Sequence, residues 1–174
     1  MARWVFSWNP LPLTGPASVP ERGERYGVCQ SEPPLAFSGV VLDTSVVFSA
    51  LRSRRGASFQ LLSRVGTGAF EIAVSVPLVL EYEDVCMRKL DDLALEAEDV
   101  QAILDYVCSV ARHQHIFFLW RPLLRDPKDD MVAELAFASG CDVIVTHNRR
   151  DFEQVESLGV RVVGPAVFLR ELES

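Results

Sequence analysis

Short runs of β-branched residues alternate with segments of helical periodicity from Gly39 to the end of the chain. Residues 40–42, VVL, include no polar position, which is typical of a strand buried on both faces of a parallel sheet. Alternation of this kind predicts βαβ units and an α/β fold whose mainly parallel sheet is covered on both faces. The expected strands are 40–42, 70–75, 115–120, 142–146 and 160–163, and the expected helices are 44–51, 58–65, 77–90, 95–111, 126–139, 151–157 and a last one opened by Pro165.

The first 37 residues differ in composition from the rest. They contain six of the ten prolines and show no sustained period of a helix or a strand. Because proline fixes φ and removes a hydrogen-bond donor, this density disfavours both elements. We therefore predict a flexible, proline-rich extension at 1–37 and one folded domain at 38–174.

The charge balance restricts the class of function. The chain has 17 basic and 24 acidic residues, a formal charge of −7. This disfavours a protein held on nucleic acid by bulk electrostatics, but not an enzyme that meets phosphate through bound cations. Its four cysteines lack zinc-ligand spacing. With no secretory signal, and no apolar run near the roughly 20 residues of a membrane helix, we expect a cytoplasmic protein without a membrane partner.

Polar residues follow two of the predicted strands at their carboxyl ends, where open α/β sheets bind ligands. Asp43 comes directly after 40–42, and a charged group there must be solvated, paired or bound to a metal. The cap of the following helix is an equally good interpretation of Asp43. The loop 146–152, after the strand 142–146, adds Asn148 and Asp151.

Three acids stand at the start of the helix 126–139, where acidic residues favour the helix dipole. The apolar face of that helix is predicted at Met131, Val132, Leu135 and Ala136. Asp129 lies beside this face, whereas Asp130 and Glu134 are predicted to project into solvent. Asp129 is therefore the better site candidate.

The helix that begins at Pro77 has two acidic candidates, Glu81 and Glu83. They flank its buried stripe on opposite sides, so periodicity does not choose between them. Carboxylates that converge at one sheet edge without matching bases indicate a hard divalent cation such as Mg²⁺ or Mn²⁺. Gly-rich phosphate loops and a G-x-S-x-G nucleophile are both missing from the sequence.

Four motifs occur in an order and spacing that resemble the PIN-domain ribonucleases, in particular the bacterial toxin components of toxin–antitoxin systems (VapC-like). They are VVLDTSV at 40–46, SVPLVLEYE at 75–83, DPKDD at 126–130 and IVTHNRRDF at 144–152. The resemblance covers roughly residues 39–172 and implies a three-layer α/β/α sandwich. The domain at 38–174 would then be a PIN-like nuclease domain.

The resemblance also implies which residues form the site. Asp43, Glu81 and Asp129 match the first three acids of the family. Where many relatives have an aspartate as the fourth acid, this chain has Asn148, and Asp151 follows three residues later. The implied catalytic and metal-binding residues are therefore Asp43, Glu81, Asp129 and Asp151.

Residues beside these acids have supporting roles in this interpretation. Thr44 or Ser45 would orient Asp43, and Thr146 with Asn148 would complete the loop. Arg149 and Arg150 would contact phosphate. Because an asparagine supplies a metal ligand without a charge, we expect one ion to be held firmly and a second weakly.

The implied reaction is hydrolysis of RNA phosphodiester bonds by an endoribonuclease that uses Mg²⁺ or Mn²⁺. The implied partners are an RNA substrate and an antitoxin protein, and a homodimer is kept as an alternative to a monomer. Two other readings stay open: an RNA-processing nuclease with no toxin role, and a catalytically weakened PIN-like protein that binds RNA or a partner.

Overall fold

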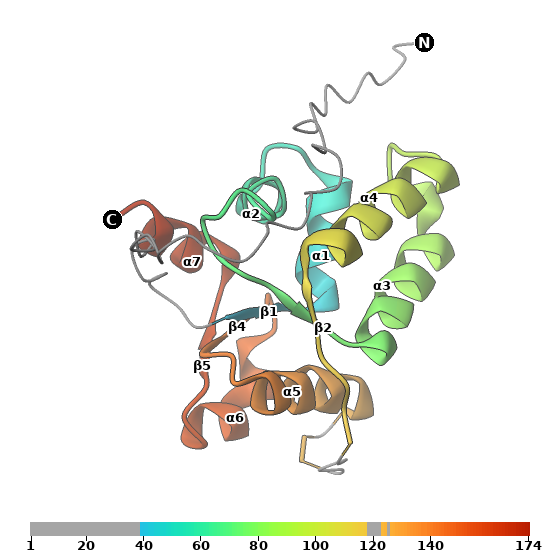
Figure 1. Ribbon diagram of the computed structural model, residues 1–174. Coiled ribbons are helices and arrows are strands. Elements are labelled where there is room, and N and C mark those ends of the chain that lie inside the picture. Colours follow the sequence, from blue (N-terminus) through green and yellow to red (C-terminus); the bar gives the residue numbers. More distant parts are fainter. Residues whose placement is uncertain (1–38, 118–122, 125) are drawn as a thin grey trace, which may run out of the picture. The chain divides into compact units, whose positions relative to one another are not determined.

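The computed structural model describes residues 39–117, 123–124 and 126–174 (Figure 1). The predicted extension at 1–37 lies outside the described residues. In chain order the elements are β1 (Val40–Leu42), α1 (Thr44–Arg52), α2 (Ala57–Leu62), β2 (Ala73–Val74), α3 (Val76–Arg88), η1 (Leu90–Asp92), α4 (Ala97–Val110), β3 (Arg112–His113), α5 (Pro127–Ser139), β4 (Val143–Val145), η2 (Arg149–Phe152), α6 (Glu153–Ser157), β5 (Arg161–Val163) and α7 (Pro165–Leu172).

The strands pair in parallel throughout the described part of the chain. β1 pairs with β4 and β4 with β5, while β2 pairs with β3. A parallel bridge between Val40 and Ile72 joins the two groups, which gives the spatial order β3-β2-β1-β4-β5. The predicted parallel sheet is therefore confirmed. Because β1 and β4 are adjacent and parallel, the residues that follow Leu42 and Val145 emerge at the same edge.

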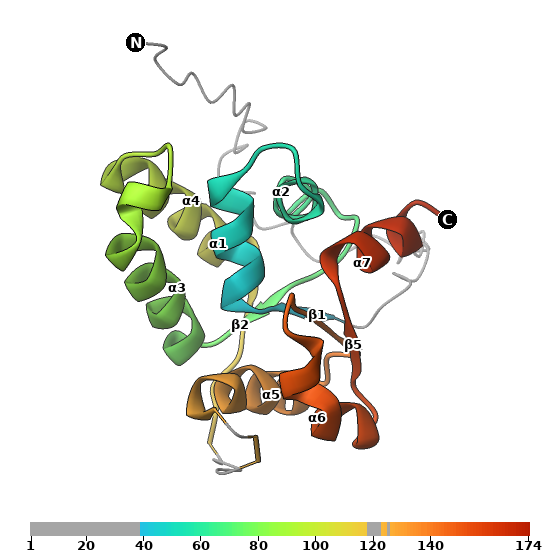
Figure 2. The same cartoon turned by 180° about the vertical axis from the view of Figure 1, so that it is seen from behind.

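Helices cover both faces of the sheet and complete a three-layer α/β/α arrangement. In Figures 1 and 2, α5 and α6 lie on one side of the strands, and α1, α2, α4 and α7 lie on the other. The strands β1 and β4 are almost entirely inaccessible to solvent, which explains why their sequences have no polar alternation. The largest buried side chains of the surrounding helical segments are Tyr82, Phe152 and Phe168.

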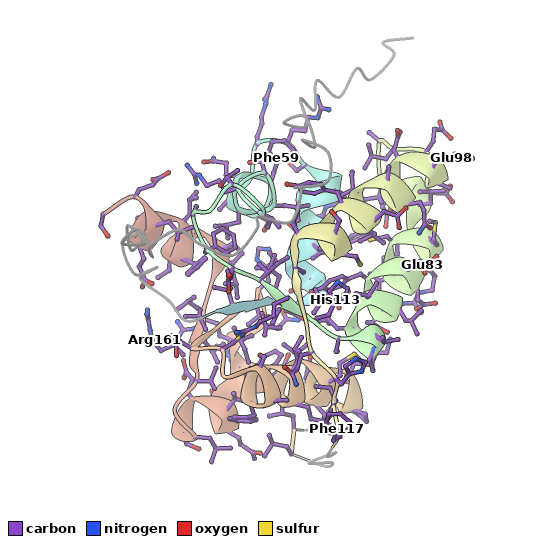
Figure 3. All side chains as sticks on the ribbon, viewed as in Figure 1. Phe59, Glu83, Glu98, His113, Phe117 and Arg161 are labelled. Atoms are coloured by element: carbon purple, nitrogen blue, oxygen red, sulfur yellow. The ribbon has the colours of Figure 1, made fainter. Side chains whose placement is uncertain are left out.

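The third strand forms at a different position from the one predicted, so that prediction was wrong. It was expected at 115–120, but β3 forms at Arg112–His113, and residues 114–117 have no regular structure. The amide of Arg112 donates to Ile72 O at 2.8 Å, so pairing with β2 begins as soon as α4 ends. Phe117, farther along the same segment (Figure 3), is 83% exposed, and residues 118–120 lie outside the described residues.

The helices begin and end close to the predicted positions. Proline stands in the first turn of α3, α5 and α7, where the missing amide proton has no helical partner to lose. α5 ends at Gly140, which adopts the left-handed conformation at φ 65°. Among the described residues, no helix is long and apolar enough to cross a membrane.

Candidate functional site

Asp43 lies at the carboxyl end of β1 and is held by two hydroxyl groups. Ser45 Oγ donates to Asp43 Oδ2 at 2.5 Å, and Thr146 Oγ1 donates to the same oxygen at 2.7 Å. Asp43 occupies the N-cap position of α1, but its side chain makes no capping hydrogen bond. Only 7% of the residue is exposed. The carboxylate therefore does not cap the helix, and of the two neighbouring hydroxyl residues Ser45, not Thr44, holds it.

The loop after β4 is tied to the same carboxylate. The amide of Asn148 donates to Thr146 Oγ1 at 2.9 Å, and the amide of His147 donates to Ser45 Oγ at 3.3 Å. The imidazole Nε2 of His147 lies 2.9 Å from the hydroxyl of Ser58, a buried residue of α2. These bonds connect strands β1 and β4 with helices α1 and α2 at one point. Asn148 itself is exposed.

Asp129 of α5 is the carboxyl group whose electrostatic surroundings are most unusual. Its pKa is raised from 3.8 to about 7, chiefly because burial removes water from the half-buried carboxyl. The negative charges of Asp43, Asp126, Asp151 and Asp130 raise this pKa further, in that order. The structure therefore brings Asp129 near Asp43, which is 86 residues earlier in the sequence, and near Asp151 of the loop after β4.

Asp130, the neighbour of Asp129, has a structural environment that the helical-face argument did not predict. It was expected to project into solvent but is only 1% exposed, and Glu134 one turn later is 3% exposed. Asp130 Oδ1 accepts the amides of Leu123 at 3.2 Å and Leu124 at 2.7 Å. The prediction was wrong for both acids because α5 packs against several strands and is buried over an arc wider than its apolar stripe.

Glu81 is the acid of α3 that reaches toward α5. Its carboxylate forms an ion pair with Lys128 Nζ at 2.7 Å, and 16% of its side chain is exposed. Glu83 lies on the same helix (Figure 3), and within the described residues it has no hydrogen bond or ion pair. Glu81 therefore lies beside the start of α5, where its partner Lys128 directly precedes Asp129 in the sequence. Glu83 has no such neighbour.

The acids around Asp129 carry the type of donor atom that a hard divalent cation prefers. Across residues 39–117, 123–124 and 126–174, no three His, Cys, Asp or Glu side chains are gathered closely enough to enclose a metal ion. Burial is the main cause of the raised pKa of Asp129, and the repulsion by neighbouring acids that adds to it is what a cation would relieve. Carboxylate oxygens are the ligands that Mg²⁺ and Mn²⁺ prefer, and Asp43, Asp129 and Asp151 supply them.

The two arginines of the loop differ in their contacts. Arg149 Nε donates to Val162 O at 3.0 Å, and its guanidinium lies 3.4 Å from a carboxylate oxygen of Glu156. Arg149 is thus engaged with the region around β5 and α6 and with none of the site acids. Arg150 is exposed. A role of either arginine in binding phosphate stays a prediction.

Three residues that contribute to the site were missed by sequence reasoning. The Tyr82 hydroxyl donates to Leu42 O, the carbonyl directly before Asp43. Burial, and then the charge of Asp43, raise the pKa of Tyr82 well above its ordinary value. Lys128 and Ser58 were likewise missed, because their partners are 47 and 89 residues away in sequence. Of the three, only Tyr82 gave a signal, because it stands between Glu81 and Glu83, which flank the predicted buried stripe of that helix.

Comparisons with known proteins agree with this architecture. The chain is similar over 72% of its length to VapBC2 from Rickettsia felis, solved bound to a DNA fragment from its promoter, with 98% of that chain covered, a TM-score of 0.52 and 16% identity. It is also similar over 78% of its length to PAE2754 from Pyrobaculum aerophilum, with 89% of that chain covered, a TM-score of 0.54 and 14% identity. No curated protein matches the sequence. The family model described as the PIN domain matches residues 39–150, which is more than half of the chain, and the protein therefore belongs to the PIN-domain family.

Proposed function

We propose that this chain is an endoribonuclease that uses Mg²⁺ or Mn²⁺ to hydrolyse RNA phosphodiester bonds. The observation that carries the proposal is the gathering of Asp43, Asp129 and Asp151 at one edge of the sheet, where burial and then the charges of the neighbouring acids raise the pKa of Asp129 to about 7. Such a group is costly in a folded protein unless a cation offsets it. PIN domains typically use divalent metal ions, which is consistent with this role.

Each acid has a distinct task in the proposed site. Asp43 and Asp129 would hold the cation, and Asp151 and Glu81 would stand beside it as further oxygen ligands. A divalent cation in this position lowers the pKa of a bound water and offsets negative charge on the phosphoryl group. Ser45 and Thr146 hold the Asp43 carboxylate in one orientation, so that it meets the cation without rearrangement. Lys128 balances the charge of Glu81 in the absence of metal.

Cleavage of single-stranded RNA tests the proposal directly. We expect cleavage with Mn²⁺ or Mg²⁺ and none with excess EDTA. Asp43→Asn should remove most of the activity, since it replaces a metal-binding charge by an amide of similar shape. Glu81→Gln should also reduce cleavage strongly, whereas the matched variant Glu83→Gln should not. Undiminished cleavage in EDTA would refute the metal-dependent mechanism.

We also propose that the protein acts in the cytoplasm as the toxin of a toxin–antitoxin pair. The fold shared with VapBC2 supports this, although at 16% identity the likeness concerns the fold alone. A short neighbouring reading frame for a DNA-binding protein is expected, and its product should co-purify with this chain and suppress cleavage. If no such partner exists, an RNA-processing nuclease becomes the better description.

One feature favours a weaker enzyme as a second candidate function. Asn148 stands exposed where many relatives have an acid, so the site has one negative charge fewer. A catalytically weakened protein would bind RNA, or a protein partner, with little cleavage. Comparing the cleavage rate of the parent with that of Asn148→Asp distinguishes the two candidates, because a weakened site should gain activity when the charge is added.

A further inference from the structure

A groove of about 490 Å³ begins at the candidate active site and runs between α1 and α3. One wall is formed by Ser45, Phe48 and Arg52 of α1, and the other by Val85 and Lys89 at the end of α3, with His147 at the loop after β4. Ser45 is the residue that donates to Asp43. The groove and the acid site therefore share a boundary.

The α1 wall of the groove is one face of a helix. Ser45, Phe48 and Arg52 are spaced by three and four residues, which places them in a row along the axis. At 1.5 Å per residue, Arg52 lies about 10 Å along the helix from Ser45. A chain lying in the groove would thus extend from the acids toward Arg52 and Lys89.

The charge of the groove is opposite to that of the acid site. Its lining residues include two cations and no carboxylate. Arg52 Cζ lies 6.0 Å and Lys89 Nζ 5.1 Å from the centre of the Phe48 ring, within the range of cation–π attraction. In the described part of the chain neither cation has an ion-pair partner.

Both cations are exposed, although the chain has a net charge of −7. Three other arginines lie against acids: Arg88 against Asp84, Arg64 against Glu173 and Arg161 against Glu171. Two exposed cations beside a partly buried aromatic ring are a combination found in grooves that bind single-stranded nucleic acid. There, cations meet phosphates and rings stack on bases.

We propose that a single-stranded nucleic acid lies in this groove, with phosphates at Arg52 and Lys89 and a base against Phe48. The proposal rests on the function proposed above, since it places the bond to be cleaved at the Asp43 end. A single strand fits better than a duplex because its unpaired bases are free to stack on an aromatic side chain. His147 and Ser45, which border both regions, would contact the strand where it enters the acid site.

Binding is tested by fluorescence anisotropy with a cleavage-resistant oligouridine, carrying 2′-O-methyl and phosphorothioate groups, in Ca²⁺ buffer. The variant Arg52→Gln/Lys89→Gln is compared with Arg88→Gln/Arg170→Gln, which removes the same charge from exposed positions outside the groove. The groove variant should bind at least about tenfold more weakly. Its slope of log K against log salt should fall by about 1.4, at 0.7 for each lost phosphate contact. The matched control should keep the parent's affinity and slope.

Phe48→Leu tests the stacking separately. It keeps an apolar side chain at a partly buried position and should weaken binding by about tenfold with little change in the salt slope. Circular dichroism melting of each variant verifies that it is folded. Equal binding by the groove and control double variants, or no binding by the parent, would overturn the proposal.

The same variants in the RNA cleavage assay separate this proposal from the nuclease function. If the parent cleaves RNA but the groove variants bind like their controls, the groove proposal fails and the nuclease proposal stands. If the parent does not cleave RNA, but oligouridine binding is lost only in the groove variants, the groove proposal stands and the nuclease proposal fails. If the groove variant loses binding of an antitoxin but keeps binding of oligouridine, the groove binds a protein and the proposal is overturned.

Discussion

Asp129→Asn should stabilise the metal-free protein, although it should remove activity. The carboxyl of Asp129 has its pKa raised from 3.8 to about 7 by burial and by neighbouring acids. Between these two pH values the folded state holds a proton that the unfolded state has released, so stability falls as the pH rises. Above about pH 7 both states are ionised and the full penalty applies. An amide at this position has no charge to repel Asp43 and Asp151.

The magnitude follows from the difference between the two pKa values. At 1.36 kcal/mol per pH unit, the interval from 3.8 to about 7 gives an upper limit of about 4 kcal/mol. Because Asp129 is only half-buried, water and salt screen much of this, and we expect a gain of about 1–2 kcal/mol. For a chain of this length, such a gain raises Tm by about 2–8 °C.

Thermal unfolding followed by circular dichroism in EDTA is the assay, at about pH 8 and about pH 5. The Tm gain of Asp129→Asn should be present at the higher pH and largely lost at the lower one, where the parent carboxyl is protonated. Asp92→Asn, an exposed acid-to-amide change, is the matched control and should shift Tm little at either pH. Mn²⁺ should raise the Tm of the parent more than that of Asp129→Asn. An equal gain at both pH values, or a loss at about pH 8, would refute the electrostatic reasoning.

Three further predictions concern residues around this centre. Asp130→Asn should destabilise the fold by about 1–3 kcal/mol in urea unfolding, because the buried carboxylate holds two loop amides. The control Glu83→Gln should change stability by less than about 0.5 kcal/mol, and equal effects would contradict a structural role for Asp130. Tyr82→Phe should cost about 0.5–1.5 kcal/mol, through loss of the bond to Leu42 O, and a neutral result would exclude a role for that hydroxyl. Asn148→Asp should tighten Mn²⁺ binding in isothermal titration, and an unchanged affinity and stoichiometry would place residue 148 outside the metal shell.

Much of the fold was predictable because burial on both faces leaves a strong pattern. The apolar runs of β1 and β4 and the prolines and glycines at helix ends identify most elements to within a few residues. The third strand was mislocated because the apolar run at 116–120 resembles a buried strand. The strand that forms, Arg112–His113, consists of two polar residues with no apolar pattern. Its position is set by pairing with β2, a tertiary interaction that local periodicity does not contain.

The site was predictable to a lesser degree. Asp43 could be located because it directly follows a buried strand, but its hydroxyl partner Thr146 is 103 residues away. Periodicity left Glu81 and Glu83 equivalent, and the contact with Lys128 separates them only in the folded chain. The helical-face argument selected Asp129, although it wrongly placed Asp130 in solvent. Such an argument assumes that acids avoid the buried face of a helix, and it does not include nearby main-chain amides that can bind a buried carboxylate.

The shared oxygen of Asp43 has a consequence for how this chain could vary through evolution. Each hydroxyl that meets Oδ2 has a single proton, which it gives to the carboxylate, and each accepts an amide proton from the loop after β4. The ring of bonds therefore closes only if Ser45 stays two residues after Asp43 and Asn148 two residues after Thr146. A one-residue insertion in either short segment would therefore break the bonds that depend on its two-residue spacing.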